Sequence, residues 1–257
     1  MSSTREETDR AGGARRRLLE RLVSARKLVR AEAIFFAALA AFAVLALYAR
    51  ADAYFAWDLR ATLALQGVDA PGFPALMRAA SVFGNGANGW LLTALAMLLF
   101  FLRRRRTEMF ALLLSVGGGA VVNRFVKLAV GRPRPVEQLV RVSGEWARES
   151  FPSGHVTFYV CYFGFLFFVA FALLPRGSNA RRAALALAAL PVLLIGLSRM
   201  YLGAHWASDV LGAYLLSGAW LALCVHLYGR WKARSTFHRD EVSAAAAQPA
   251  ADETPRP

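Results

Sequence analysis

Cysteine and histidine are scarce in this chain, and each shortage argues against a class of site. The sequence has 257 residues but only 2 cysteines and 4 histidines. Cys161 and Cys224 lie in separate apolar runs, so a disulfide is not expected and the pair does not indicate a redox compartment. No closely spaced set of Cys and His ligands occurs, which argues against a structural zinc site.

Acidic residues are also few. Asp and Glu number 17 against 31 Lys and Arg, which leaves a net charge of +14. The basic residues cluster between apolar runs and near the chain ends, where such residues set membrane topology and contact anionic lipid headgroups. The pattern therefore favours a lipid bilayer as partner and argues against nucleic acid. No carboxylate cluster that would hold magnesium occurs near the motifs described below, so neither a metal nor another cofactor is expected.

Long apolar runs are abundant instead, in a chain that is 57% hydrophobic with a mean hydropathy of +0.38. A helix needs about 20 apolar residues to cross a hydrocarbon core of about 30 Å. Each run is apolar on all sides, as expected for a helix in lipid. We predict an all-α polytopic membrane protein, with six transmembrane helices bundled within residues 33–230. The six runs are Ala33–Ala49, Asn88–Leu102, Met109–Leu128, His155–Leu174, Ala183–Leu197 and Ser208–Tyr228.

The flanking segments are polar. Residues 1–32 are basic and too long for the start of a cleavable signal peptide, and residues 231–257 form an Ala- and Pro-rich tail that we expect to be disordered. Between the first two runs, Ala51–Gln66 mixes aromatic and charged residues and is predicted to be an amphipathic segment in the outer interface.

Lysine and arginine also predict the direction of the spans. They concentrate in four alternate segments, namely 1–32, 103–106, 176–182 and 230–239. The positive-inside rule makes these segments and both termini cytoplasmic. The loops 50–87, 129–154 and 199–207 then face outward. The composition is typical of a bacterium, so the expected location is the cytoplasmic (inner) membrane, with the outer loops facing the periplasm.

The first chemical motif follows the third run. It is rich in basic residues although it lies on the predicted outer side, which is contrary to the positive-inside rule. Lys127 lies near the outer end of that run, and Arg134 follows seven residues later within the sequence GRPRP. The prolines end the helix and stiffen the backbone between the arginines. An ammonium and a guanidinium both suit phosphate oxygens. For Arg124 and Arg132, the sequence is equally consistent with phosphate binding and with side chains that extend to lipid headgroups.

The second motif, Pro152–His155, opens the fourth run. Ser153 is a good N-cap residue, and Gly154 allows close approach of a ligand to the backbone. The N–H groups and the dipole at a helix N-terminus favour an anion there. His155 begins the span beside several aromatic residues.

The third motif joins the fifth and sixth runs and contains Arg199, His205 and Asp209. If the helix starts by His205, the i,i+4 spacing places Asp209 on the same face. The carboxylate then accepts the Nδ1–H of the imidazole, leaves Nε2 free to attack and stabilises a phosphorylated ring. All three motifs fall at the outer ends of their spans, so we expect one active site there.

Together these motifs resemble the three-part signature of the type 2 phosphatidic acid phosphatase superfamily. The matching elements are Lys127-x6-Arg134-Pro135, Pro152-Ser153-Gly154-His155 and Ser198-Arg199-x5-His205-x3-Asp209. The resemblance covers about residues 30–230 and leaves out both tails. It implies a membrane phosphatase that needs no metal.

The resemblance also implies a role for each motif residue. His205 would be the nucleophile, Asp209 would orient it and His155 would protonate the leaving oxygen. The phosphate would be held by Lys127, Arg134, Ser153, Gly154 and Arg199.

The sequence therefore predicts a phosphatase that acts on a lipid phosphate or pyrophosphate at the outer leaflet. Transfer of the phosphate to another lipid or to a sugar fits the same motifs. An anionic-lipid transporter would explain the arginines but not the spacing of His205 and Asp209. Haloperoxidase chemistry would more naturally use a soluble scaffold. Undecaprenyl pyrophosphate, phosphatidylglycerophosphate, phosphatidic acid and lipid A phosphates all fit the site, and the oligomeric state is not specified.

Overall fold

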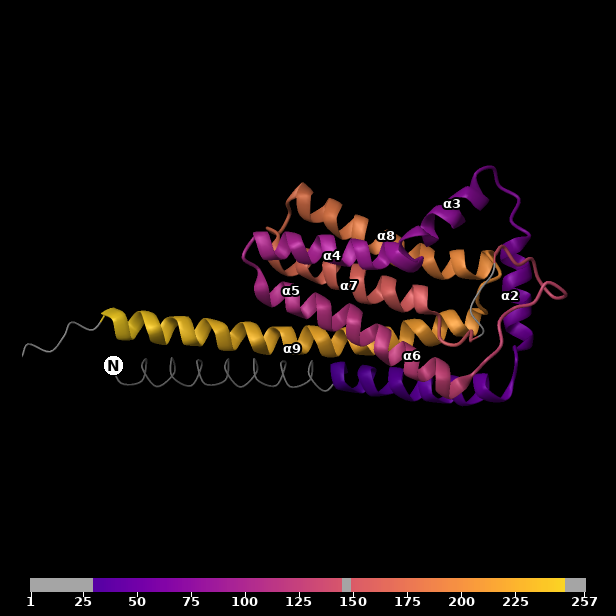
Figure 1. Ribbon diagram of the computed structural model, residues 1–257, viewed down its shortest axis with the longest axis horizontal. Helices are drawn as coiled ribbons and strands as arrows, with labels where there is room; N and C mark the ends of the chain where they lie inside the picture. The colour runs from indigo at the N-terminus through magenta and orange to yellow at the C-terminus, as the bar shows by residue number, and fades with distance from the viewer. Residues whose placement is uncertain (1–29, 145–148, 248–257) are drawn as a thin grey trace, which may run out of the picture.

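The protein is a bundle of helices in the computed structural model, which describes residues 30–144 and 149–247 (Figure 1). Over these residues the chain is helical apart from its loops and one isolated bridge between Pro133 and Glu149. An N-terminal helix, Arg30–Ala51, precedes the labelled elements. These are α2 (Ala56–Gln66), α3 (Phe73–Ser81), α4 (Gly86–Leu102), α5 (Arg106–Leu113), α6 (Gly119–Val130), α7 (Gly154–Leu173), α8 (Asn179–Tyr201) and α9 (Ala207–Ala247).

Within residues 30–144 and 149–247, five helices are long and apolar enough to cross a membrane, and a bent pair brings the number to six if it forms one span. The pair joins Phe73–Gly84 to Gly86–Leu102 at an angle of 62°. A π-helical turn, η2 (Leu114–Gly118), links α5 and α6 into one span. The predicted all-α membrane architecture is therefore confirmed. The second span differs from the prediction because α3 extends it beyond a bend at Asn85, among the glycines of residues 84–89.

Several helices continue past their apolar runs, because backbone hydrogen bonding does not require apolar side chains. The fifth run becomes Asn179–Tyr201, and α9 stays helical to Ala247. The disorder predicted for residues 231–257 is therefore wrong for 231–247, while 248–257 lie outside the described residues. Most of the basic N-terminal segment, residues 1–29, also lies outside them.

The centre of the bundle is α7, which packs against both α8 and α9. Its buried residues include Tyr159, Tyr162 and Phe165. Close approach at its side depends on Gly119 of α6, where an added Cβ would lie 2.6 Å from the Cys161 sulfur. The π-turn contributes too, because the Ser115 hydroxyl donates to the Cys161 carbonyl at 2.8 Å. These contacts fix the position of α7 along α6, and therefore the position of the α7 N-terminus.

The short helix α2 lies across one end of the bundle, where α6 and α8 end and α9 begins (Figure 1). Its polar residues Asp58, Thr62 and Gln66 are spaced four apart on one face and are buried, whereas Trp57 and Leu63 are exposed. The polar face of the segment predicted to be amphipathic thus faces the protein. Its location in the outer interface stays a prediction.

Candidate active site

The three sequence motifs lie at the end of the bundle that α2 crosses (Figure 1). Lys127 is in the last turn of α6, Ser153 is the N-cap residue of α7, and Arg199 is in the last turn of α8. Direct contacts join the motifs. Arg134 Nη1 lies 3.4 Å from His205 Nε2, and the Ser153 N–H donates to the Asp209 carbonyl at 3.2 Å. The motifs therefore form one cluster.

His205 lies in the short connection between α8 and α9 and is only 1% exposed. Arg134 Nη1 contacts its Nε2 and also donates to the Ala204 carbonyl at 2.8 Å. Burial lowers the pKa of His205 well below its ordinary value, and the positive charges of Arg134, Lys127 and Arg199 lower it further. The ring is therefore neutral near pH 7, with Nε2 on the side of the arginines.

The Nδ1 side of His205 differs from the prediction. Asp209 Oδ2 lies 3.6 Å from Nδ1, which is too long for the expected hydrogen bond. Instead, the Ser150 hydroxyl lies 3.4 Å from Nδ1 and donates to Asp209 Oδ2. The Trp206 N–H donates to the same oxygen at 2.8 Å. Because α9 starts at Ala207, His205 precedes the helix, and Ser150 lies between the two groups that were predicted to touch.

Arg132 is the largest omission of the sequence prediction. It does not extend to lipid headgroups, since it is 1% exposed and its guanidinium bridges Asp58 at 2.9 Å and Asp209 at 2.7 Å. One signal could have indicated this position. Residues two apart in extended backbone point to the same side, so a proline-stiffened GRPRP segment places Arg132 beside Arg134. Arg124, by contrast, is exposed and pairs with Glu149 at 3.6 Å.

Arg199 and Lys127 complete the cationic part of the site. Arg199 is 1% exposed and donates to the Ser81 hydroxyl at the end of α3. Lys127 Nζ donates to the Glu149 and Ser150 carbonyls at 2.9 and 3.1 Å. Lys127 therefore positions the segment that carries Ser150 while its charge acts on His205. The Arg134 guanidinium has a pKa below its ordinary value because of burial.

Ser153 and Gly154 begin α7 as predicted, but the serine does not cap the helix. Its side chain makes no capping hydrogen bond and is fully buried. Within residues 30–144 and 149–247, Ser153 Oγ has no hydrogen-bond partner. A buried hydroxyl without a partner is costly. Its position at a helix N-terminus therefore suits a bound anion.

His155 lies in the first turn of α7, on the side of the α3–α4 bend. Its Nε2 is 2.8 Å from Asn85 Oδ1, a partner that the sequence did not indicate. Gly84 packs directly on the ring, and an added Cβ there would overlap it. The positive charges of Arg199, Arg134 and Lys127 interact electrostatically with His155, and so does His205. The second histidine therefore belongs to the same electrostatic environment as the first.

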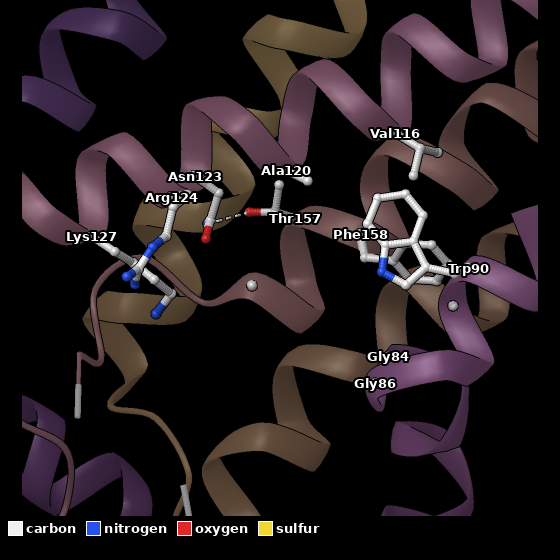
Figure 2. Close-up of a pocket in the computed structure, with 12 residues that line it drawn as sticks. Gly84, Gly86, Trp90, Val116, Ala120, Asn123, Arg124, Lys127, Thr157 and Phe158 are labelled. Carbon is white, nitrogen blue, oxygen red and sulfur yellow. Dashed lines mark hydrogen bonds between the residues drawn. The ribbon is translucent and has the colours of Figure 1, made fainter. Parts of the chain in front are cut away.

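A cavity of about 300 Å³ extends from the motifs along the bundle between α4, α6 and α7 (Figure 2). Lys127 and Arg124 line one end, and Trp90, Val116 and Phe158 line the other. Its polar end borders Gly154 and its opposite end is apolar, a combination that suits an amphiphilic ligand. Among the residues that the structure describes, no group of three or more His, Cys, Asp or Glu side chains could hold a metal ion.

Comparison with known proteins extends the sequence resemblance. Residues 108–233 match the sequence model of the PAP2 superfamily. Phosphatidylglycerophosphatase B from Bacillus subtilis is 33% identical over 106 residues, which cover 41% of this chain and 50% of the relative. Lipid A 1-phosphatase from Rhizobium johnstonii is 40% identical over 116 residues, which cover 42% of each chain. The chain thus spans about half the length of these curated relatives or less.

Two solved structures share the fold. A transmembrane PAP2-type phosphatidylglycerolphosphate phosphatase from Bacillus subtilis matches with a TM-score of 0.67 and 23% identity, over 76% of this chain and 96% of that one. Aquifex aeolicus LpxE matches with a TM-score of 0.52 and 22% identity, over 67% of this chain and 96% of that one. The matched segment 108–233, just under half of the chain, contains all three motifs of the PAP2 superfamily, and this integral membrane protein shares the fold of the PAP2-type phosphatase.

Proposed function

We propose that this protein is a lipid phosphatase that hydrolyses a phosphate or pyrophosphate group through a phosphohistidine at His205. The observation that carries the proposal is the position of one neutral, buried imidazole whose Nε2 faces a guanidinium. Arg134, Arg199 and Lys127 all act on this ring. A nucleophile surrounded by fixed cations suits phosphoryl transfer, where positioning and electrostatic stabilisation supply most of the catalysis.

In the first step the cations hold the phosphate oxygens, with help from Ser153 Oγ and the Gly154 N–H. His205 Nε2 attacks phosphorus, so that a P–N bond forms as the P–O bond to the leaving group breaks. The negative charge of the bound phosphate favours protonation of His155 despite the nearby cations, and the protonated ring gives its proton to the leaving oxygen. Asp209 and Ser150 lie on the Nδ1 side of His205, where positive charge develops on the phosphorylated ring.

In the second step water attacks the phosphohistidine. His155, now neutral, takes a proton from the water as its oxygen bonds to phosphorus. The P–N bond breaks, inorganic phosphate leaves and His205 returns to its neutral form. No metal ion takes part in either step.

The cavity beside Lys127 supports a lipid as substrate. Its polar end adjoins the cations, and its apolar end runs between helices that are apolar enough to cross a membrane. A lipid with its headgroup at the motifs would place part of its chain along Phe158 and Trp90. The distribution of basic residues favours the outer leaflet of a bacterial inner membrane for this reaction. Both named relatives act on lipid phosphates, which makes phosphatidylglycerophosphate and lipid A 1-phosphate the first substrates to test.

The test is phosphate release by the purified protein in detergent with a chelator present. The lipids to compare are phosphatidylglycerophosphate, lipid A 1-phosphate, undecaprenyl pyrophosphate and phosphatidic acid. We expect turnover of at least one lipid without added metal, and its loss in His205→Ala. His226→Ala is the matched control, because His226 is an exposed histidine on α9 outside the site. Full phosphate release by His205→Ala would overturn the proposed nucleophile.

A further inference from the structure

A buried chain of charges connects α2 to the candidate nucleophile. Asp58 on α2, Arg132 after α6 and Asp209 on α9 all have side chains with 0% exposure. Arg132 Nη2 pairs with Asp58 Oδ2 at 2.9 Å, and Nη1 pairs with Asp209 Oδ1 at 2.7 Å. Burying charges carries a large desolvation cost unless the pairing geometry is good. A chain of this kind therefore calls for an explanation beyond adhesion between helices.

Further hydrogen bonds fix the orientation of the side chains in this row of charges. The Arg132 Nε–H donates to the Asp52 carbonyl at 3.2 Å, so each guanidinium nitrogen has an acceptor. The Ser208 N–H and hydroxyl both donate to Asp58, each at 2.7 Å. Asp58 thus holds the first turn of α9 and the guanidinium together, and neither can rotate without breaking several bonds.

The two oxygens of Asp209 face different partners. Oδ1 accepts from Arg132, whereas Oδ2 accepts from Ser150 and Trp206 and faces His205. If Arg132 were the only partner of Asp209, its positive charge would cancel most of the electrostatic effect of the Asp209 carboxylate at the imidazole. Asp58 supplies a second carboxylate, so the three ionised groups carry one net negative charge. In a buried site, where screening is weak, this charge acts on His205.

We propose that Asp58 is a positioning residue for the phosphoryl-transfer reaction, acting through Arg132 to orient Asp209 and keep its negative charge available to His205. The inference rests on the proposed function. Asp58 lies outside residues 108–233, the segment that matches the PAP2 superfamily. It stabilises the positive charge that develops on the ring as the P–N bond forms. Its effect therefore falls on the chemical step more than on substrate binding.

A purely structural role for Asp58 can be separated from this one, because α2 has a second attachment. Gln66 Nε2 donates to the Arg141 carbonyl at 2.7 Å and to the Tyr201 carbonyl at 2.9 Å, and Gln66 Oε1 accepts the Arg141 N–H. These bonds hold α2 to the loop after α6 and to the end of α8, without contact to Asp209. Gln66→Ala therefore loosens α2 and leaves the charge chain intact.

The experiment measures kcat and KM for phosphatidylglycerophosphate in detergent micelles, or for whichever of the four lipids turns over fastest. We expect Asp58→Asn to lower kcat about ten- to a hundredfold, the loss typical of partners that orient a functional side chain, with little change in KM. Asp58→Glu should restore part of the loss. Gln66→Ala should lower the unfolding temperature and leave kcat nearly unchanged. Asp69→Asn, at an exposed position, should change neither quantity.

A double-mutant cycle tests the route through Arg132. Asp58→Asn should lower kcat much less in an Arg132→Gln background than in the native chain. If Arg132→Gln does not fold, the kcat and KM values of Asp58→Asn, Asp58→Glu and Gln66→Ala decide alone. A kcat for Asp58→Asn equal to that of Asp69→Asn, or matched by Gln66→Ala, would overturn the role of Asp58. If His205→Ala keeps full activity, the proposed function itself fails, whatever Asp58→Asn does.

Discussion

Each end of the bundle holds a buried carboxylate paired with a cation, and the two pairs differ in what lies beside them. At the α2 end, Asp209 and Arg132 are sealed from solvent, and Asp209 faces His205. At the other end, Glu108 of α5 is 2% exposed and accepts hydrogen bonds from Tyr228 and Lys232 of α9. The Lys232 side chain remains 39% exposed.

The difference shows that a buried ion pair does not by itself mark an active site. Glu108 fastens α5 to α9 through a flexible cation that reaches water. Arg132 instead joins two carboxylates through a rigid fork of N–H donors, and the far oxygen of one carboxylate faces an imidazole. The proposed chemistry depends on this imidazole. Substitutions at the two ends should therefore separate activity from stability.

The largest effect is expected at His205, with His226 toward the other end as its control. His205→Ala removes the proposed nucleophile and should lower kcat by on the order of 10⁴-fold or more, as for other nucleophiles of covalent catalysis. His226→Ala, toward the Glu108 end of α9, should leave kcat unchanged. Phosphate release by both purified variants, with thermal unfolding as the folding control, checks the contrast. Equal activity of the two variants would contradict a special role for the α2 end.

The second effect concerns the geometry of the two cations. Arg132→Lys replaces a fork that reaches two carboxylates by a single ammonium, so kcat should fall about ten- to a hundredfold. Lys232→Arg keeps a long cation beside Glu108 and should be tolerated. Steady-state kinetics of both variants, each confirmed as folded, provide the measurement. An active Arg132→Lys variant would mean that charge alone, without the bridge, is sufficient.

A smaller effect is the response to acid. Because burial and the nearby cations lower the pKa of His205 well below 6.5, the ring stays neutral as the pH falls through that value. The His205-dependent acid limb of kcat/KM should therefore lie below about pH 6.5. The free energy of unfolding should nevertheless decrease below about pH 6.5, since the unfolded chain binds the proton more readily.

Kinetic profiles and denaturant titrations from pH 5 to 8 measure these two quantities. The second ionisation of a phosphate monoester lies near pH 6, so the substrate is titrated separately in the same micelles. An acid limb that follows His205 protonation at or above its ordinary pKa would contradict the buried, cation-flanked environment.

The sequence predicted the spans and the motif residues for different physical reasons. Continuous apolar runs follow from the solvent, since lipid admits no polar face on an isolated helix. The motif residues were found because each motif is local and its members have characteristic spacing. Both kinds of prediction are insensitive to how the loops fold. The structure places Lys127, Arg134, His155, Arg199, His205 and Asp209 at one end of the bundle, while their catalytic roles remain proposals.

What the sequence could not provide depends on partners far apart in the chain. Arg132 and Asp58 are separated by 74 residues, and neither has a recognisable spacing to the other. The polar face of α2 resembles a solvent-exposed face in the sequence because its partners lie far along the chain, in the loop after α6, at the end of α8 and in the first turn of α9. Ser150 and Asn85 were missed for the same reason, since a single serine or asparagine in a loop carries little signal until a histidine is found beside it.

The smallest effect on activity is expected at Glu108, the counterpart of Asp209. Glu108→Gln keeps the size of the side chain and one oxygen for Tyr228, but removes the charge that Lys232 approaches. The free energy of unfolding should fall by about 1.5–3 kcal/mol, the range for a hydrogen bond to a charged group. Unlike Asp58→Asn, this variant should leave kcat unchanged, because the described side-chain contacts of Glu108 are to Tyr228, Lys232 and Arg105 rather than to an imidazole. Thermal unfolding and phosphate release, measured on the same preparation, compare the two ends directly. A fall in kcat without a fall in stability would show that the Glu108 end also communicates with the chemistry, and the comparison would fail.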